Sequence, residues 1–145
     1  MPTTRRSKTF AATPEALWDI VGDAHHMPRW WPRVSRMEGV DAKGFTQVLL
    51  TSKGKTVRAD FRVLESSRPQ VRSWTQELVN TPFERILAEA RTEVRLEARG
   101  SDTKVTISLR QKLRGLAAFG SFMVRGATKG QLDEALEGLR GLVEP

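Results

Sequence analysis

The 145-residue sequence contains no cysteine, which excludes disulfide bonds and thiolate chemistry. It has no apolar run near the about 18 residues of a membrane span, since the longest candidate, residues 115–124, is too short. The opening MPTTRRSKTF lacks the apolar centre of a signal peptide. These absences predict a cytoplasmic protein without a transmembrane segment, and the length predicts one domain, residues 1–145.

Residues that carry chemistry are also scarce. The two histidines, His25 and His26, are adjacent, so on a helix they diverge by about 100° and do not form the i, i+4 pair that a metal prefers. The sequence has no HExxH pattern and no GxSxG pattern, which argues against a zinc site and a serine hydrolase. We therefore expect no metal and no cofactor, and the sequence assigns no catalytic residue.

The net charge of +7 is the one feature that suggests a nucleic-acid partner. The charges are mixed, however, as in ERILAEARTEVRLEARG, and only TRRSK and RQKLR are locally basic. This distribution is typical of solvated strands. On one strand, arginines alternate with glutamates on an inferred outer face, at Glu89, Arg91, Glu93, Arg95, Glu97 and Arg99. We expect cross-strand ion pairs there, weak salt-sensitive DNA binding and no specific nucleic-acid partner.

The N-terminal region predicts a short strand followed by a capped helix. After a strand around residues 5–11, Thr13 suits the N-cap position and Pro14 the first helical position of the segment TPEALWDIV. The buried stripe of this helix is expected to consist of Leu17, Trp18 and Val21. A second short helix through AHHM is limited by the prolines at 28 and 32.

From residue 34 to 113 the hydrophobic pattern has a period of two. The clearest run of apolar and small side chains is Ile86, Ala88, Ala90, Thr92, Val94, Leu96 and Ala98. Its composition favours a helix, but only a strand gives these positions one face, so periodicity predicts a strand. Breaks near residues 41–44, 52–55 and 80–82, and turns between them, divide the region into about six strands of an antiparallel meander.

The C-terminal region predicts a helix over about residues 115–142. Its apolar residues form two groups on different sides of the helix. The first group is Leu116, Phe119 and Met123, and the second is Leu132, Leu136, Leu139 and Val143. Gly126 and Gly130 lie at the changeover, so we predict a kink or a change of buried face between Gly126 and Leu132.

This order of elements resembles the START-like (SRPBCC) superfamily, which has the helix-grip fold of the major birch-pollen allergen. Within residues 11–34, the segment ATPEALWDIVGDAHHMPRWWPRV is similar to the opening of bacterial polyketide cyclase/dehydrase-like proteins. The resemblance implies an α+β fold with a curved antiparallel sheet wrapped around a long C-terminal helix and two short helices near the N-terminus. It also implies a largely apolar cavity between the sheet and the last helix.

In such a fold, the residues expected to line the cavity and bind ligand are Trp30, Trp31, Phe61, Trp74, Gln76, Gln111, Phe119 and Met123. One indole of the WWP segment is expected to fill the core, and the other to lie near the mouth of the cavity. Gln47 and Gln76 lie in strands whose inward-facing phase the sequence does not fix. The charged Asp60 and Arg62 are expected to face solvent because they alternate with an apolar face.

The leading functional hypothesis is the binding of a small hydrophobic molecule, such as a lipid, quinone, polyketide or aromatic metabolite. The alternative is a polyketide cyclase or aromatase that uses the same cavity, with polar side chains and ordered water to move protons. A protein-interaction role like that of some members of the superfamily, and a homodimer, both stay open. The fold alone does not choose, because this superfamily hosts several functions on one scaffold.

Overall fold

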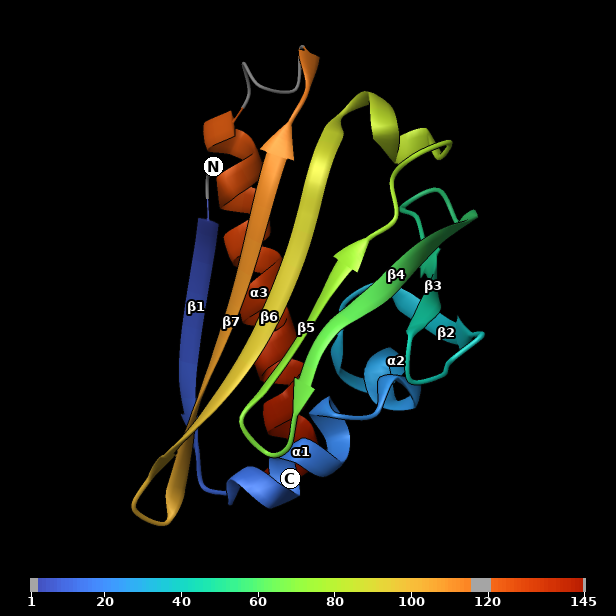
Figure 1. The fold of residues 1–145 in the computed structure, drawn as a ribbon. Coiled ribbons are helices and arrows are strands. Elements are labelled where there is room, and N and C mark those ends of the chain that lie inside the picture. Colours follow the sequence, from blue (N-terminus) through green and yellow to red (C-terminus); the bar gives the residue numbers. More distant parts are fainter. Residues whose placement is uncertain (1–2, 116–120, 145) are drawn as a thin grey trace.

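A seven-stranded antiparallel sheet and one long helix make up most of the molecule (Figure 1). The computed structural model describes residues 3–115 and 121–144, and for residues 121–125 only the backbone. The strands pair in the order β1-β7-β6-β5-β4-β3-β2. Their bounds are β1 Thr3–Phe10, β2 Val34–Glu38, β3 Gly44–Leu50, β4 Thr56–Ser67, β5 Val71–Gln76, β6 Leu87–Arg99 and β7 Asp102–Leu113. The helix-grip fold and the six-strand meander predicted from the sequence are confirmed.

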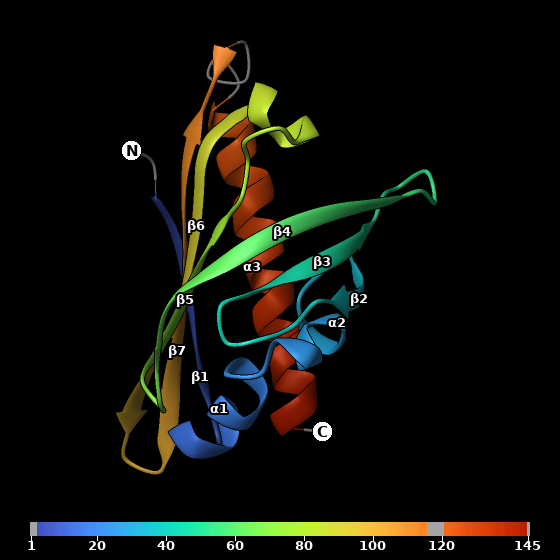
Figure 2. The same ribbon diagram turned by 45° about the vertical axis from the view of Figure 1, so that its right-hand side comes forward.

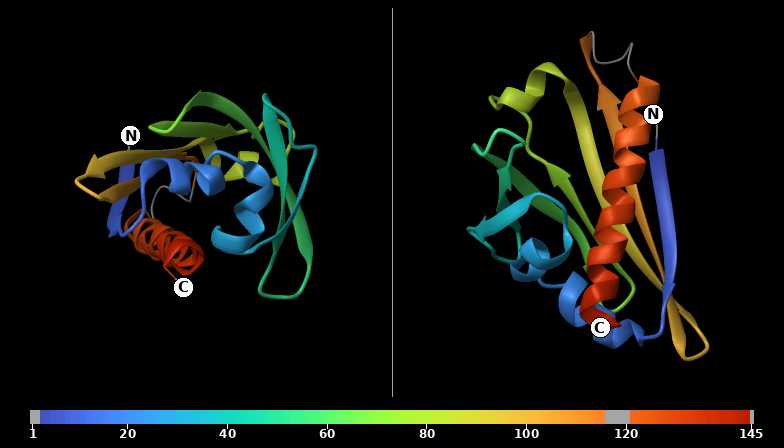
Figure 3. Two further views of the ribbon diagram at one scale, coloured as in Figure 1. Left: turned by 90° about the horizontal axis from the view of Figure 1, so that it is seen from below. Right: turned by 180° about the vertical axis from the view of Figure 1, so that it is seen from behind.

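The sheet is strongly curved, so it encloses a concave side. Figure 2 shows β3 and β4 bending away from β1 and β7, and Figure 3 shows α3 (Ser121–Val143) lying along the concave side. The largest fully buried side chains come from the sheet, from α3 and from the short N-terminal helices, and they include Phe10, Leu17, Met27, Trp74, Ile107, Leu132 and Leu139. No helix in the described part of the chain is long and apolar enough to cross a membrane.

The short N-terminal helices close one end of the sheet. They are α1 (Pro14–Val21), the 3-10 helix η1 (Ala24–His26) and α2 (Met27–Trp30). The Thr13 hydroxyl accepts a hydrogen bond from the backbone N–H of Ala16 at 3.2 Å, as expected for an N-cap. The predicted stripe of Leu17, Trp18 and Val21 is buried.

Strand β6 confirms the period-two prediction for most of its length and corrects it at one end. From Ala90 to Leu96, alternate residues are buried. At the start, however, Leu87 is buried and Ile86 is 49% exposed, which reverses the predicted phase. The register shifts between Leu87 and Glu89, and such an irregularity moves the side chains on one side of it to the opposite face.

Helix α3 also differs from its prediction. It runs without a break through Gly126 and Gly130, and Figure 3 shows no kink before Leu132. Thr128 and Leu132 are buried on one face. The side chains of Leu116, Phe119 and Met123 lie outside the described residues, so the predicted change of buried face stays a prediction. A Cβ at either glycine would meet no described atom within 4 Å, so close packing does not require them. Tertiary packing against β1 and α2 holds the helix straight despite the glycine cost.

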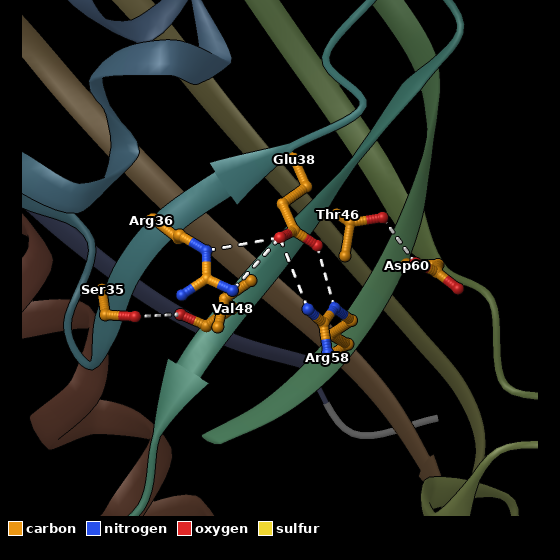
Figure 4. Close-up of polar contacts among 7 residues, drawn as sticks. All are labelled: Ser35, Arg36, Glu38, Thr46, Val48, Arg58 and Asp60. Atoms are coloured by element: carbon orange, nitrogen blue, oxygen red, sulfur yellow. Dashed lines mark hydrogen bonds and ion pairs between the residues drawn. The ribbon is translucent and has the colours of Figure 1, made fainter. Parts of the chain in front are cut away.

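On the convex face of β2, β3 and β4, arginines are neutralised by carboxylates (Figure 4). Glu38 accepts hydrogen bonds from Arg36 and from Arg58, whose Nε lies 2.8 Å from a Glu38 oxygen. Val48 is completely buried between them, in register with both arginines, so their aliphatic stems cover it. Neighbouring Thr46 donates to Asp60.

The ion pairs of β6 run along the strand, which corrects the expected cross-strand pairing. Arg95 pairs with Glu93 at 3.3 Å, and Arg99 with Glu97 at 2.9 Å. In each pair the arginine and the glutamate are two positions apart on the strand, so their side chains project from the same face. They can therefore form an ion pair without a residue of a neighbouring strand. These exposed pairs contribute about 0–1 kcal/mol each.

The C-terminal half of α3 approaches α2 so closely that only glycine fits at position 138. A Cβ there would lie 2.6 Å from the carbonyl oxygen of Trp30 and 2.9 Å from its Cα. We therefore expect Gly138→Ala to lower the free energy of unfolding by about 1–3 kcal/mol, since backbone must move. Gly141→Ala in the same helix meets nothing within 4 Å and should raise it by about 0.5–1 kcal/mol. Urea unfolding of both variants checks this, and equal stabilities would contradict it.

Glu137 ties α3 to the first strand. Its carboxylate accepts a hydrogen bond from Lys8 of β1 and another from Arg140. These contacts, that of Lys8 first, lower the pKa of Glu137 from 4.5 to about 2. A lowered pKa in the folded state means that the ionised group stabilises the fold above pH 4.5 and that this contribution disappears as the pH falls to about 2.

We expect Glu137→Gln to lower the melting temperature at pH 6 and to have a much smaller effect near pH 2, because about half of the carboxylate is protonated there in the folded wild type. The measurement is thermal unfolding of both proteins between pH 2 and 7. Glu134→Gln is the control, since Glu134 is exposed on the same helix and makes no ion pair among the described residues. A stability difference that is the same at pH 6 and pH 2 would contradict the expectation.

Candidate functional site

A cavity of about 130 Å³ lies between the concave face of the sheet and α3. Strands β3 to β7 contribute alternate residues to it, because every second side chain of a strand points to the same side. The remaining contributions come from the end of α2, from the 3-10 helix η2 (Pro82–Arg85) and from α3. Its apolar lining residues are Trp31, Leu49, Ala59, Phe61, Trp74, Phe83, Ala90 and Leu109.

Aromatic rings form a rigid frame at the base of this cavity. The Trp31 ring packs edge-on against Trp74 with centroids 5.9 Å apart, and Phe45 packs edge-on against the same Trp74 ring at 5.8 Å. Phe45 also stacks on Phe61 at 5.3 Å. Such contacts stabilise by about 0.5–1.5 kcal/mol each beyond simple burial, so the frame is held in place before any ligand enters.

The two tryptophans of the WWP segment have different environments. They contact each other edge-on, with centroids 5.4 Å apart. Trp31 lies at the C-cap of α2, where the backbone turns extended, and it lines the cavity. Trp30 is buried in the core, where its indole Nε1 has no hydrogen-bond partner in the described structure. The segment thus directs one indole into the core and the other into the cavity.

Five polar side chains reach the cavity, and all of them are neutral: Gln47, Gln76, Thr92, Gln111 and Gln131. Within the described part of the chain, two of them have hydrogen-bond partners. The Nε2 of Gln47 donates to the Sδ of Met27 at 3.3 Å, and the Oε1 of Gln111 accepts from the Thr128 hydroxyl at 3.3 Å. Amide groups both donate and accept hydrogen bonds, so this wall suits a ligand with neutral oxygen or nitrogen atoms.

Gln47 is the most buried of the four glutamines in the lining. Its side chain is 2% exposed, and among the described residues its amide has one hydrogen bond, to the weakly accepting sulfur of Met27. Burying an amide without good partners costs about 1–3 kcal/mol. The position therefore lowers stability unless another polar group completes its hydrogen bonds.

Ionisable groups are absent from the described lining of the cavity. Arg72 is the buried charged residue that lies nearest along the chain to a lining residue. It is two positions from Trp74 and on the same face of β5. Burial lowers the pKa of its guanidinium, and the charge of Asp23 partly offsets this effect. Its Nη1 donates to Ser66 at 3.0 Å, while its Nε has no partner in the described structure.

An apolar groove of about 220 Å³ adjoins the cavity. The two share Leu49, Phe83 and Gln131 as lining residues. Pro32, Val57 and Leu50, which is 46% exposed, belong to the groove alone. The groove therefore extends the cavity toward the surface between the β3–β4 hairpin and η2.

The structure brings together five of the eight residues predicted to bind ligand: Trp31, Phe61, Trp74, Gln76 and Gln111 line the cavity. Trp30 does not line it. Phe119 lies outside the described residues, and so does the side chain of Met123. Whether the five bind a ligand stays a prediction.

Sequence reasoning missed several lining residues. Gln47 was left open because its phase was unknown, although the buried alternation of Phe45 and Gln47 places both on the concave side. The apolar residues of the C-terminal helix define its predicted inner face. Because Gln131 is polar, this pattern does not identify it as a lining residue. Phe83 lies in η2, within a region predicted only as a break between strands.

The chain matches one protein family over nearly its whole length. The family described as polyketide cyclase/dehydrase and lipid transport matches residues 1–144. No curated protein matches the sequence.

Solved structures with the same fold cover almost the whole chain. XoxI from Bacillus cereus is 16% identical, with a TM-score of 0.78 over 99% of this chain and 96% of that chain. A START superfamily protein from Mycobacterium smegmatis is 15% identical, with a TM-score of 0.77 over 98% and 97%. The Zhui aromatase/cyclase from Streptomyces sp. R1128 is 16% identical, with a TM-score of 0.76 over 99% and 93%.

These structural similarities show the fold alone, because the identities are low. The family match covers the strands, the short helices and α3 together, and it agrees with the resemblance found in residues 11–34. The chain belongs to the family described as polyketide cyclase/dehydrase and lipid transport, and its fold is similar to that of a START superfamily protein.

Proposed function

We propose that this protein binds a small hydrophobic molecule carrying a neutral oxygen group, such as a ketone, quinone or phenol, in the cavity under α3. The observation that carries the proposal is the buried Gln47 amide, whose only hydrogen-bond partner among the described residues is a thioether, in a wall that contains aromatic rings. A ligand oxygen beside this amide would supply the missing hydrogen bond. The proposal also takes the protein to be cytoplasmic.

The size of the cavity limits the part of the ligand that it holds. An engineered apolar cavity of about 150 Å³ binds benzene, so about 130 Å³ suits one ring or a short chain. The adjoining groove offers room for the remainder along Leu50 and Val57. The ligand is therefore elongated, with its polar ring at the glutamines and an apolar body in the groove.

The neutrality of the wall favours an uncharged ligand. An isolated carboxylate or ammonium loses its hydration on entry and meets no opposite charge among the described residues that line the cavity. The cation Arg33 lines the adjoining groove and not the cavity. A carbonyl or hydroxyl loses less and is matched by the amides of Gln47 and Gln76. Aromatic ketones and quinones are thus favoured over fatty acids.

The alternative is a cyclase or aromatase that uses the same cavity. It is supported by the polar side chains in the wall, which suit the orientation of a polyketone and an ordered water. Amides do not transfer protons near neutral pH, so such an enzyme would have to move protons through water or the substrate itself. Binding requires none of these additional steps, and we therefore favour it.

Replacing the side-chain amide of Gln47 should have opposite effects on stability and on ligand binding. We expect Gln47→Leu to raise the free energy of unfolding by about 1 kcal/mol, because it removes a poorly bonded buried polar group. The same change should weaken binding of 1,4-naphthoquinone about tenfold, the loss expected for one hydrogen bond left unmade. Calorimetry and urea unfolding measure the two effects.

Gln70→Leu is the matched control, since Gln70 is exposed and outside the cavity, and it should change binding little. Native mass spectrometry of protein purified from cells extends the test to its natural ligand. A ligand-free protein whose melting temperature does not respond to naphthoquinone, aromatic ketones or decanoic acid would overturn the proposal. Tight binding of decanoic acid alone would overturn the preference for a neutral head.

Filling the cavity should abolish binding without unfolding the chain. Ala90 is 7% exposed and lines the cavity from β6, so Ala90→Leu places three further carbon atoms in the space. We expect naphthoquinone binding to fall about tenfold or more, because ligand and side chain occupy the same volume. Ala98→Leu, at an exposed position of the same strand, should bind normally. Equal binding by both variants would locate the ligand elsewhere.

A further inference from the structure

Three arginines gather on the convex face of the sheet without a carboxylate partner. They are Arg5 of β1, Arg110 of β7 and Arg91 of β6, on strands that are adjacent in the sheet (Figure 1). They alternate with buried residues that face α3, so they lie on the opposite face. All three are exposed, and none makes a hydrogen bond or ion pair through its side chain among the described residues. Together with Thr3, Glu93 and Ser108 they line a shallow hollow of about 230 Å³.

The pairing of these strands brings like charges together. Arg91 is the register partner of Arg110, and Arg110 is in turn the partner of Thr3 on the other side. Like charges directly opposite each other in neighbouring strands destabilise a sheet. A neutral side chain at either position would remove this repulsion, so the arrangement costs stability in the unliganded protein.

Other arginines of the convex face are neutralised. Arg36 and Arg58 share Glu38 (Figure 4), and Arg95 and Arg99 each have a glutamate of their own strand. The one carboxylate in the lining, Glu93, is bonded to Arg95. The next carboxylate along β6, Glu89, is not part of the lining.

We propose that Arg5, Arg91 and Arg110 form a binding site for the phosphate group of a soluble phosphorylated molecule. Guanidinium groups present parallel N–H donors that bind phosphate oxygens in pairs, and the hydroxyls of Thr3 and Ser108 add neutral donors. Three cations are sufficient to neutralise the charge of a phosphate dianion or of pyrophosphate near neutral pH. The lining contains no large apolar side chain, so it lacks the groups that insert into a membrane.

This site is separate from the cavity, although the same strand segments build both. Arg91 lies between Ala90 and Thr92, and Arg110 between Leu109 and Gln111, which face the cavity from the other side of the sheet. The phosphate site does not rest on the proposed binding of a hydrophobic ligand. Gln47→Leu should therefore leave phosphate binding unchanged, and either proposal can fail without the other.

The test is titration of the full-length protein with sodium pyrophosphate and with inorganic phosphate, using sodium chloride at matched ionic strength as the reference. We expect saturable binding that shifts the backbone amide resonances of residues 91, 108 and 110. Arg91→Gln and Arg110→Gln should each weaken it about tenfold, the loss expected for a charge-assisted contact. Both variants should melt no lower than the wild type, since they remove like-charge repulsion.

Arg99→Gln is the matched control, because it removes the same charge from the same face of β6 at an ion-paired position. It should bind pyrophosphate within about twofold of the wild type, as a distant surface charge contributes little at moderate salt. An equal loss in Arg99→Gln, an equal response to chloride, or resonance shifts elsewhere would overturn the proposal. Binding to vesicles of phosphatidylglycerol without binding to pyrophosphate would also overturn it.

Discussion

The packing of α3 against the backbone of Trp30 sets the geometry on which the rest of the structure depends. Gly138 lets the helix approach α2 to a distance that no other residue permits, and Leu132 and Leu139 are completely buried on the same stretch. The helix is thereby fixed at its C-terminal half. Strands β3 and β4 bend away from the edge of the sheet that α3 follows (Figure 2), and Gln131 of α3 lines the cavity.

The alternation of side chains along each strand gives the sheet two different surfaces. On the concave side, aromatic rings and neutral amides form a wall whose polar groups are incompletely satisfied, most clearly at Gln47. On the convex side, arginines are either paired with glutamates, as at Glu38, or left together, as at Arg91 and Arg110. Both unsatisfied arrangements cost stability in the free protein, which is why we assign a ligand to each.

The family to which the chain belongs leaves its specific function open, because one scaffold hosts different activities. The distinction lies in the side chains that reach the cavity. Here these are amides and one hydroxyl within an aromatic frame that includes Trp31 and Trp74. Their chemistry favours recognition of a neutral polar group over proton transfer, and the small volume favours a ring-sized head.

The sequence by itself determined the elements and their order. Local signals suffice for these: Thr13 and Pro14 start a helix whatever lies around them, and strict alternation makes a strand of residues 90–96 despite their helical composition. The fold followed because this order of elements matched a known one. Five of the eight proposed cavity residues lie together, and two of them, Phe61 and Gln111, are on strands whose inner phase is clear from the sequence.

Only the tertiary structure decided the features that depend on distant residues. The register shift at Leu87 reversed a face that local periodicity had assigned to Ile86, since the partner strand sets the register. The straightness of α3 through Gly130 depends on packing against other elements of the fold. The helix propensities of the residues themselves do not include the free energy of this packing. Which arginines lack a carboxylate depends in the same way on strand pairing, because a charge meets its neighbours across strands that are far apart in the chain.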